Sequence, residues 1–157
     1  RRAAAVHCDL QGGDAMSTQL FPMIQPQAWE GGRELPLCVE IGWDYAANQP
    51  RFLRGEPVEV QGLDAVLVWA WKALHTERFR YEIYTWAYGS ELESLIGQPY
   101  TGELKRAEAI RYVREALLIN PYIRSVDDIS VTFLDGLLEI SCALTSIYGK
   151  GALEAHV

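Results

Sequence analysis

The side chains of this chain that could carry out chemistry are its histidines, its cysteines and the acids that lie close to aromatic residues. The histidines are His7, His75 and His156, and none has the spacing of a His-x-x-x-His or His-Glu-x-x-His metal site. The cysteines are odd in number and widely spaced, which is typical of reduced thiols rather than a disulfide framework. We expect Cys38 and Cys142 to be small strand residues, and we predict no metal ion and no cofactor.

Paired carboxyl groups could hydrolyse a glycosidic bond if one of them were held as an acid in an apolar cleft. The acids near aromatic clusters are Glu77, Glu82, Glu91 and Glu93. Such residues are usually solvated, and neither a Gly-x-Ser-x-Gly elbow nor a phosphate-binding loop accompanies them. We predict that the protein is not an enzyme. The alternatives are a small peptidoglycan hydrolase that uses Glu77 and Glu82, and a binding module with aromatic ligand contacts.

The composition is that of one globular domain with an acidic surface. The 157 residues are 49% hydrophobic and 22% charged, and 21 acidic residues against 14 basic ones give a formal net charge of −7. A negative field repels nucleic acid and anionic membrane surfaces. The longest nearly apolar run, residues 65–74, is about half as long as a membrane span requires. We therefore predict neither nucleic acid nor membrane as a partner.

Residues 1–36 are predicted to form an extended, Pro-rich arm. Pro22, Pro26 and Pro36, together with the pair Gly31-Gly32, prevent regular strand ladders. Within the arm, residues 1–15 lack the apolar core of a secretory signal, and Met16 is a more natural start. We interpret residues 1–15 as a non-native segment or an upstream extension. Residues 37–157 are predicted to form a single α+β domain.

The domain is predicted to begin with a small antiparallel meander and to continue with helices. Alternation from Leu37 to Trp43 predicts a strand with one buried face, followed by a turn at 48–50 and short strands up to Val60. From residue 62 to 74 the apolar period becomes helical. Val68 and Trp69 lie outside the main apolar stripe, which indicates packing on a second side, either within this chain or against a partner.

Two further helices are predicted. Ser90 and Glu93 have the spacing of a capping box for a short helix that reaches Ile96. A longer helix covers residues 102–119, with Ala107, Ile110, Val113 and Leu117 toward the core, and Asn120-Pro121 ends it.

The last predicted unit is a β-hairpin with an Asp135-Gly136 turn. A two-residue loop pairs Phe133 with Leu138, Val131 with Ile140 and Ile129 with Cys142. Leu153, Ala155 and Val157 continue a weak alternation, as in another strand. The predicted fold class is therefore α+β: an N-terminal antiparallel meander, two main helices plus a short one, and a C-terminal β-hairpin sheet.

Three blocks of sequence carry a resemblance to a known family. They are GLDAVLVWAWKALHT at 62–76, ERFRYEIY at 77–84 with YGSELESLIG at 88–97, and EALLINP at 115–121. In this order they resemble the sheath-initiator family of contractile phage tails, and more closely its branch in Gram-positive phages, defective prophages and tailocins. The similarity covers roughly residues 37–148. The "lysozyme-like" label of some members finds no support in the residues of this chain.

The resemblance implies a structural protein of the baseplate in a phage or tailocin particle, assembled in the bacterial cytoplasm. The implied partners are the sheath protein and the wedge and hub proteins of the baseplate, with six copies around the tail. Where better-known members have a Glu-Pro-Arg tripeptide, this chain has Glu77-Arg78-Phe79-Arg80. We expect Arg78 and Arg80 to anchor the wedge contact. The alternative is a solvated pair, or an internal salt bridge to Glu77 or Glu82.

The hairpin is the expected contact with the sheath. An unpaired strand edge templates another strand, and the resemblance implies that sheath arms add to this sheet. The alternative is that the meander or the chain's own C-terminus covers both edges. The predicted interface residues, beside the two arginines, are Val68, Trp69, Thr132, Ser141, Leu153 and Val157.

Overall fold

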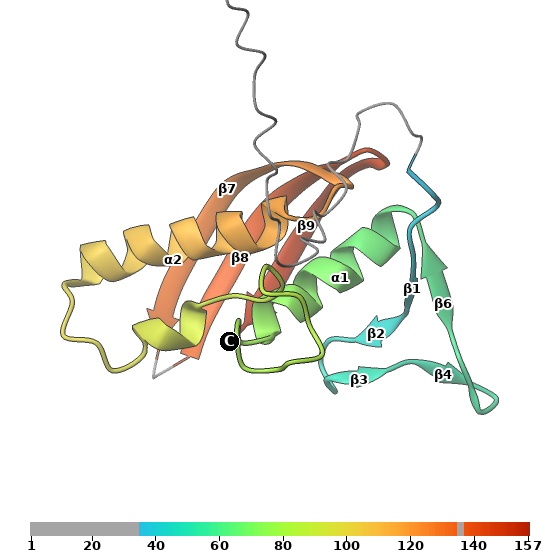
Figure 1. The fold of residues 1–157 in the computed structure, drawn as a ribbon, viewed down its shortest axis with the longest axis horizontal. Coiled ribbons are helices and arrows are strands. Elements are labelled where there is room, and N and C mark those ends of the chain that lie inside the picture. Colours follow the sequence, from blue (N-terminus) through green and yellow to red (C-terminus); the bar gives the residue numbers. More distant parts are fainter. Residues whose placement is uncertain (1–34, 135–136) are drawn as a thin grey trace, which may run out of the picture. The chain divides into compact units, whose positions relative to one another are not determined.

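Two helices cover one face of a three-stranded antiparallel sheet (Figure 1). The computed structural model describes residues 35–134 and 137–157, which belong to one unit, Leu35–Val157. The helices are α1 (Leu63–His75) and α2 (Gly102–Leu118), and the strands, in spatial order, are β7 (Ile123–Leu134), β8 (Leu137–Ser146) and β9 (Gly149–His156). The predicted α+β class is confirmed. Most of the predicted arm and the Asp135-Gly136 turn lie outside the described residues.

The predicted hairpin register is confirmed near the turn and is wrong farther from it. Phe133 pairs with Leu138 and Val131 with Ile140, as expected. Ile129 does not pair directly with Cys142, because the ladder passes from the pair Ser130–Ser141 to the pair Asp127–Ala143 and leaves two β7 residues opposite one of β8. This bulge, with Asp128 at φ 51°, lets Val126 and Val131 both face the core although their spacing is odd.

The C-terminal residues form β9, which pairs with β8 along the strand, for example at Cys142–Leu153 and Ile140–Ala155. The prediction that they continue as another strand is confirmed. Strand β8 is therefore the centre of the sheet and β9 an edge.

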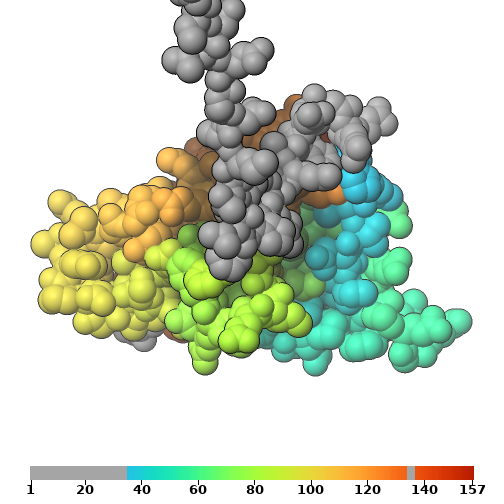
Figure 2. Space-filling model, viewed as in Figure 1, coloured from blue at the N-terminus to red at the C-terminus, as the bar shows by residue number. Residues whose placement is uncertain are grey.

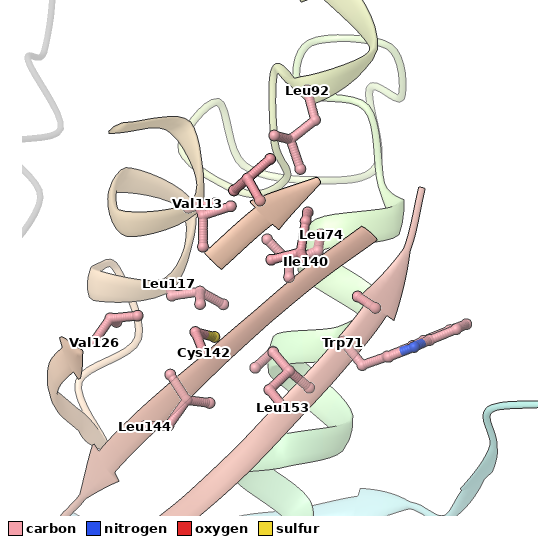
Figure 3. Close-up of a cluster of buried hydrophobic side chains, with 14 of the residues drawn as sticks. Trp71, Leu74, Leu92, Val113, Leu117, Val126, Ile140, Cys142, Leu144 and Leu153 are labelled. Carbon is pink, nitrogen blue, oxygen red and sulfur yellow. The ribbon is translucent and has the colours of Figure 1, made fainter. Parts of the chain in front are cut away.

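The core lies between the sheet and the two helices (Figure 3). It contains Leu74 from α1, Leu117 from α2 and Leu144 from β8, each nearly or fully inaccessible. The stripe predicted for α2 is turned slightly, because Ala107 is exposed whereas Ala109 is buried. The predicted stop after α2 is confirmed at Leu118.

The meander is present and packs against the second side of α1 (Figure 1). Its strands are β1 (Val39–Ile41), β2 (Trp43–Asp44), β3 (Gln49–Pro50), β4 (Phe52–Leu53), β5 (Glu56–Pro57) and β6 (Glu59–Gln61). They pair as β1–β6, β2–β3 and β4–β5. The expectation of a buried apolar face on its first strand is wrong at Leu37 and Val39, which are 56% and 46% exposed.

The capping box predicted for the short helix is wrong. The observed element is a 3-10 turn, η1 (Leu92–Leu95), and the residue at its N-cap position is Glu91, not Ser90. Ser90 is instead buried, and its hydroxyl donates a hydrogen bond to the carbonyl oxygen of Leu74, 2.8 Å away. The side chain therefore satisfies the C-terminal end of α1, since the last carbonyls of a helix lack partners within it.

Candidate assembly surfaces

The segment Glu77–Gly89 connects α1 to η1 and is termed the aromatic loop. Two main-chain hydrogen bonds close it at its base: Arg78 donates to the carbonyl of Ser90 (2.9 Å), and Ser90 donates to that of Thr76 (2.8 Å). Gly89 makes this closure possible at φ 101°, because a Cβ there would lie 2.6 Å from the carbonyl oxygen of Thr76. The loop is thus fixed at its base.

The aromatic loop exposes several large apolar side chains. It lies on the face of the molecule that Figure 2 shows, in yellow-green. Ile83 and Trp86 are 87% and 82% exposed, and Phe79 lies 5.6 Å from Trp86 between ring centres. Phe79, Tyr84 and Trp86 line a hollow in this loop, whereas Ile83 lies outside it. Contiguous exposed apolar surface is typical of a protein contact.

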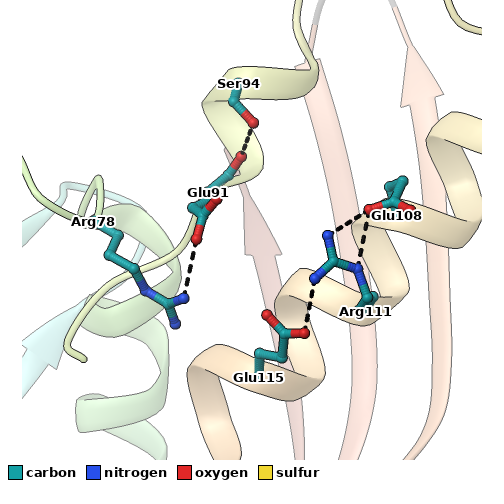
Figure 4. Close-up of polar contacts among 6 residues, drawn as sticks. All are labelled: Arg78, Glu91, Ser94, Glu108, Arg111 and Glu115. Carbon is teal, nitrogen blue, oxygen red and sulfur yellow. Dashed lines mark hydrogen bonds and ion pairs between the residues drawn. The ribbon is translucent and has the colours of Figure 1, made fainter. Parts of the chain in front are cut away.

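The structure places both predicted arginines at the start of this loop, in different environments. Arg78 is mostly buried, with 11% of its side chain exposed, and its Nη1 lies 3.1 Å from a carboxylate oxygen of Glu91 (Figure 4). Its Nε–H is buried and has no partner among the described residues. Arg80 is 56% exposed and pairs with Glu77 at 3.0 Å, and this hydrogen bond raises the pKa of Arg80. Glu91 as the partner of Arg78 was not predicted, since no spacing rule links a loop to a 3-10 turn.

The two acids of the alternative hydrolase, Glu77 and Glu82, both line the hollow of the aromatic loop. Glu77 is held by Arg80, and Glu82 is an exposed loop residue. Within residues 35–134 and 137–157, no three His, Cys, Asp or Glu side chains are grouped as ligands of a metal ion would be. None of the helices in the described part of the chain has the length and hydropathy needed to cross a membrane.

Four further predicted interface residues lie in or against the core of this chain. Val68 and Leu153 are buried, at 4% exposure each. Trp69 is half-buried and packs edge-on against Tyr88 at 5.6 Å, and Val157 packs against the core. Val68 therefore packs within this chain and not against a partner, which were the two possibilities for the second side of α1.

The direction of the main-chain groups decides which strand edges are open. Leu138 and Val157 exchange two hydrogen bonds, of 2.8 and 2.9 Å, so the main-chain groups of Leu138 point toward β9. Because successive residues in an antiparallel strand point to opposite neighbours, Glu139 and Ser141 point toward β7. Their partners there, Thr132 and Ser130, therefore point toward β8.

This geometry corrects the predicted edge donors. Thr132 and Ser141 use their main-chain groups inside the β7–β8 ladder, so neither offers a free donor to another chain. Strand β9, the chain's own C-terminal strand, covers the outer edge of β8, as the alternative interpretation of the hairpin expected for the C-terminus. The edges of the sheet that are still unpaired are the outer edges of β7 and β9.

Two comparisons identify the kind of protein to which these surfaces belong. Residues 39–149 match the family model described as contractile injection system sheath initiator. Over 96 residues the chain is 33% identical to the phage-like element PBSX protein XkdS of Bacillus subtilis (strain 168), which covers 60% of this chain and 67% of that relative. The family match includes the three blocks that carry the resemblance and most of the described structure. The chain therefore belongs to the sheath initiator family of contractile injection systems, as a structural tail component.

Proposed function

We propose that this protein docks on the baseplate of a contractile tail and seeds the sheath by pairing an edge of its C-terminal sheet with a strand from the first sheath ring. The observation that supports the proposal is the sheet itself. The sheet has two edge strands, β7 and β9. The unpaired N–H and C=O groups of an edge strand template a further strand. Six copies around the tail and assembly in the bacterial cytoplasm belong to the same proposal.

The aromatic loop supplies the proposed contact with the baseplate wedge. Ile83 and Trp86 are the most exposed large apolar side chains of the described residues, and Arg80 lies on the same loop with an exposed guanidinium. Arg78 has a different part in this contact, because its ion pair with Glu91 fixes the base of the loop. Val68 and Leu153 are left out of the proposed contacts because their side chains are buried within the chain.

The sheath-seeding proposal is tested by making tail particles without this chain and adding the purified protein back. We expect tubes with baseplates but no sheath in its absence, and sheathed tails when it is restored. Sheath of normal length on particles that lack the chain would contradict the proposal. Electron microscopy of the particles gives the readout.

The docking proposal is tested with Arg80→Ala and Trp86→Ala. Both side chains are exposed, so the melting temperature should stay close to that of the wild type. We expect less of each variant in purified baseplates, because each removes a contact from the proposed interface. Lys150→Ala is the control, since Lys150 is exposed on β9 and away from this loop. Baseplates that contain normal amounts of both loop variants would contradict the contact.

A further inference from the structure

We infer that the sheath strand binds at the outer edge of β9, in a groove between β9 and the β2–β3 turn, and that the groove selects a segment with alternating apolar side chains. The inference rests on the proposed function, and it specifies the edge, the residues and the chemistry of the partner segment.

The outer edge of β9 carries a row of main-chain groups that pair with no other strand among the described residues. Val157 points toward β8, as its hydrogen bonds with Leu138 show, so the groups of His156 point outward. His156 confirms this direction, because its carbonyl oxygen lies 2.9 Å from Nε2 of His75 on α1. By the same alternation, Ala152 and Glu154 point their N–H and C=O groups outward, and none of these groups has a main-chain partner among the described residues.

A groove runs along this edge. One wall is β9 at Ala152 and Glu154, and the floor is α1 at Leu67 and Trp71. The opposite wall is the turn between β2 and β3, at Tyr45 and Ala46. The Trp71 ring points away from the centre of the core, beyond β9 (Figure 3), and the Tyr45 ring lies 5.5 Å from it. An extended chain placed here would meet hydrogen-bonding groups on its side and aromatic rings beneath it.

The other edge of the sheet differs from the β9 edge in its bulge; a side-chain bond to an outward carbonyl and charged residues occur on both edges. On β7 the carbonyl oxygen of Val131 points outward and accepts a hydrogen bond from Nε of Arg106, 3.3 Å away. The bulge at Asp128 then interrupts the ladder, with two consecutive acids, Asp127 and Asp128, at that point. Bulges and charges are the means by which proteins prevent strands from adding to an edge. The β9 edge has no such bulge in its pairing with β8.

The lining of the groove sets the chemistry of the partner segment. Because side chains alternate along a strand, every second one would point toward α1 and contact Leu67 and Trp71. The groove therefore suits apolar side chains at these positions, with polar side chains between them on the exposed face beside Glu154. A charge at an inward position would lose water without gaining a partner.

Two variants test the groove without altering the core. Ala46→Trp adds bulk to an exposed wall residue, and Ala47→Trp, at the next exposed residue outside the groove, is its matched control. Ala152→Pro removes one outward N–H, and Ala152→Thr is its control because it keeps the N–H. Each variant is checked by its melting temperature as a full-length protein and then supplied to particles that lack the wild type.

We expect Ala46→Trp and Ala152→Pro to lower the fraction of sheathed tails by about tenfold, whereas both controls retain it. Phe133→Pro, which removes an outward N–H from β7, should also retain it. Loss of sheath with Phe133→Pro but not with the groove variants would overturn the inference and leave strand pairing intact at the other edge. Normal sheath with all three would overturn strand pairing itself, and with it the groove.

Discussion

The imidazole of His75 joins the last turn of α1 to the end of β9, with its Nε2 2.9 Å from the main-chain carbonyl oxygen of His156. Its other nitrogen, Nδ1, lies 2.8 Å from the carbonyl oxygen of Trp71, and the ring stacks on Trp71 at 3.7 Å. Both nitrogens face carbonyl acceptors, and a neutral imidazole carries one N–H, so in either tautomer the ring donates to one of the two carbonyls. A single side chain thus fixes a helix end, a strand end and one end of the groove.

Replacement of His75 by Phe should release the end of β9. The ring would still stack on Trp71, but the hydrogen bond that it donates to the carbonyl of Trp71 or of His156 would be lost, at a cost of about 1–3 kcal/mol in the free energy of unfolding. Hydrogen exchange at Val157 should become faster, and chemical denaturation measures the cost. His156→Phe is the control, because only the main chain of His156 contacts His75; its side chain lies at the surface, 3.7 Å from a carboxylate oxygen of Glu139. Equal losses in both variants would contradict this role of His75.

Gly89→Ala should be markedly destabilising. The new methyl group would lie 2.6 Å from the carbonyl oxygen of Thr76, and the residue would have to keep a φ of 101°. Gly97 also has a positive φ, of 78°, but has open space where a Cβ would lie. We expect a loss of about 2–4 kcal/mol for Gly89→Ala and about 1 kcal/mol for Gly97→Ala, by thermal or chemical denaturation. Similar losses at the two sites would show that the close approach to Thr76 is relaxed in solution.

Leu144→Ala should remove a central core contact. Leu144 lies on the middle strand, is fully buried and belongs to the cluster that joins the sheet to both helices (Figure 3). Truncation leaves a cavity, with an expected loss of about 2–5 kcal/mol in the free energy of unfolding. Leu137→Ala on the same strand is the control, since Leu137 is 59% exposed and should change stability little. Urea denaturation distinguishes the two variants.

Cys142 should make stability depend on alkaline pH. Burial raises the pKa of its thiol from an ordinary value of 9.0 to about 11. Between these values the unfolded chain ionises the thiol and the folded chain does not, so the stabilising contribution is complete below pH 9 and decreases as the pH rises toward 11. Denaturation over this range should show a steeper loss of stability in the wild type than in Cys142→Ala. Parallel pH profiles for the two proteins would contradict it.

The same burial predicts that Cys142 reacts slowly with thiol reagents in the folded protein, because the thiolate is the reactive form. Alkylation at neutral pH, located by peptide mass spectrometry, should modify Cys142 only on unfolding. Cys38, which is half-buried and also has its pKa raised by burial, is the internal comparison and should react sooner because it is more accessible.

Several elements could be predicted from the sequence alone because their determinants are local. The helical period in α1, the stop at Asn120-Pro121 and the alternation on either side of the hairpin turn need only neighbouring residues. The family resemblance likewise depended on residue order within 62–121. The alternation of Leu153 and Ala155 also predicts a strand, but it does not indicate that this strand pairs with β8.

The tertiary structure alone decided where these elements meet, because such contacts join residues distant in sequence. The bulge at Asp128 depends on which β7 side chains the helices bury, and no local pattern specifies it. Ser90 bonds to α1 instead of capping η1 because the fold brings the loop base against that helix end. The unpaired main-chain groups lie on the outer edges of β7 and β9 rather than at Thr132 or Ser141. Main-chain direction is set by the hydrogen bonds between Leu138 and Val157, and a sequence does not contain the register of such a pair.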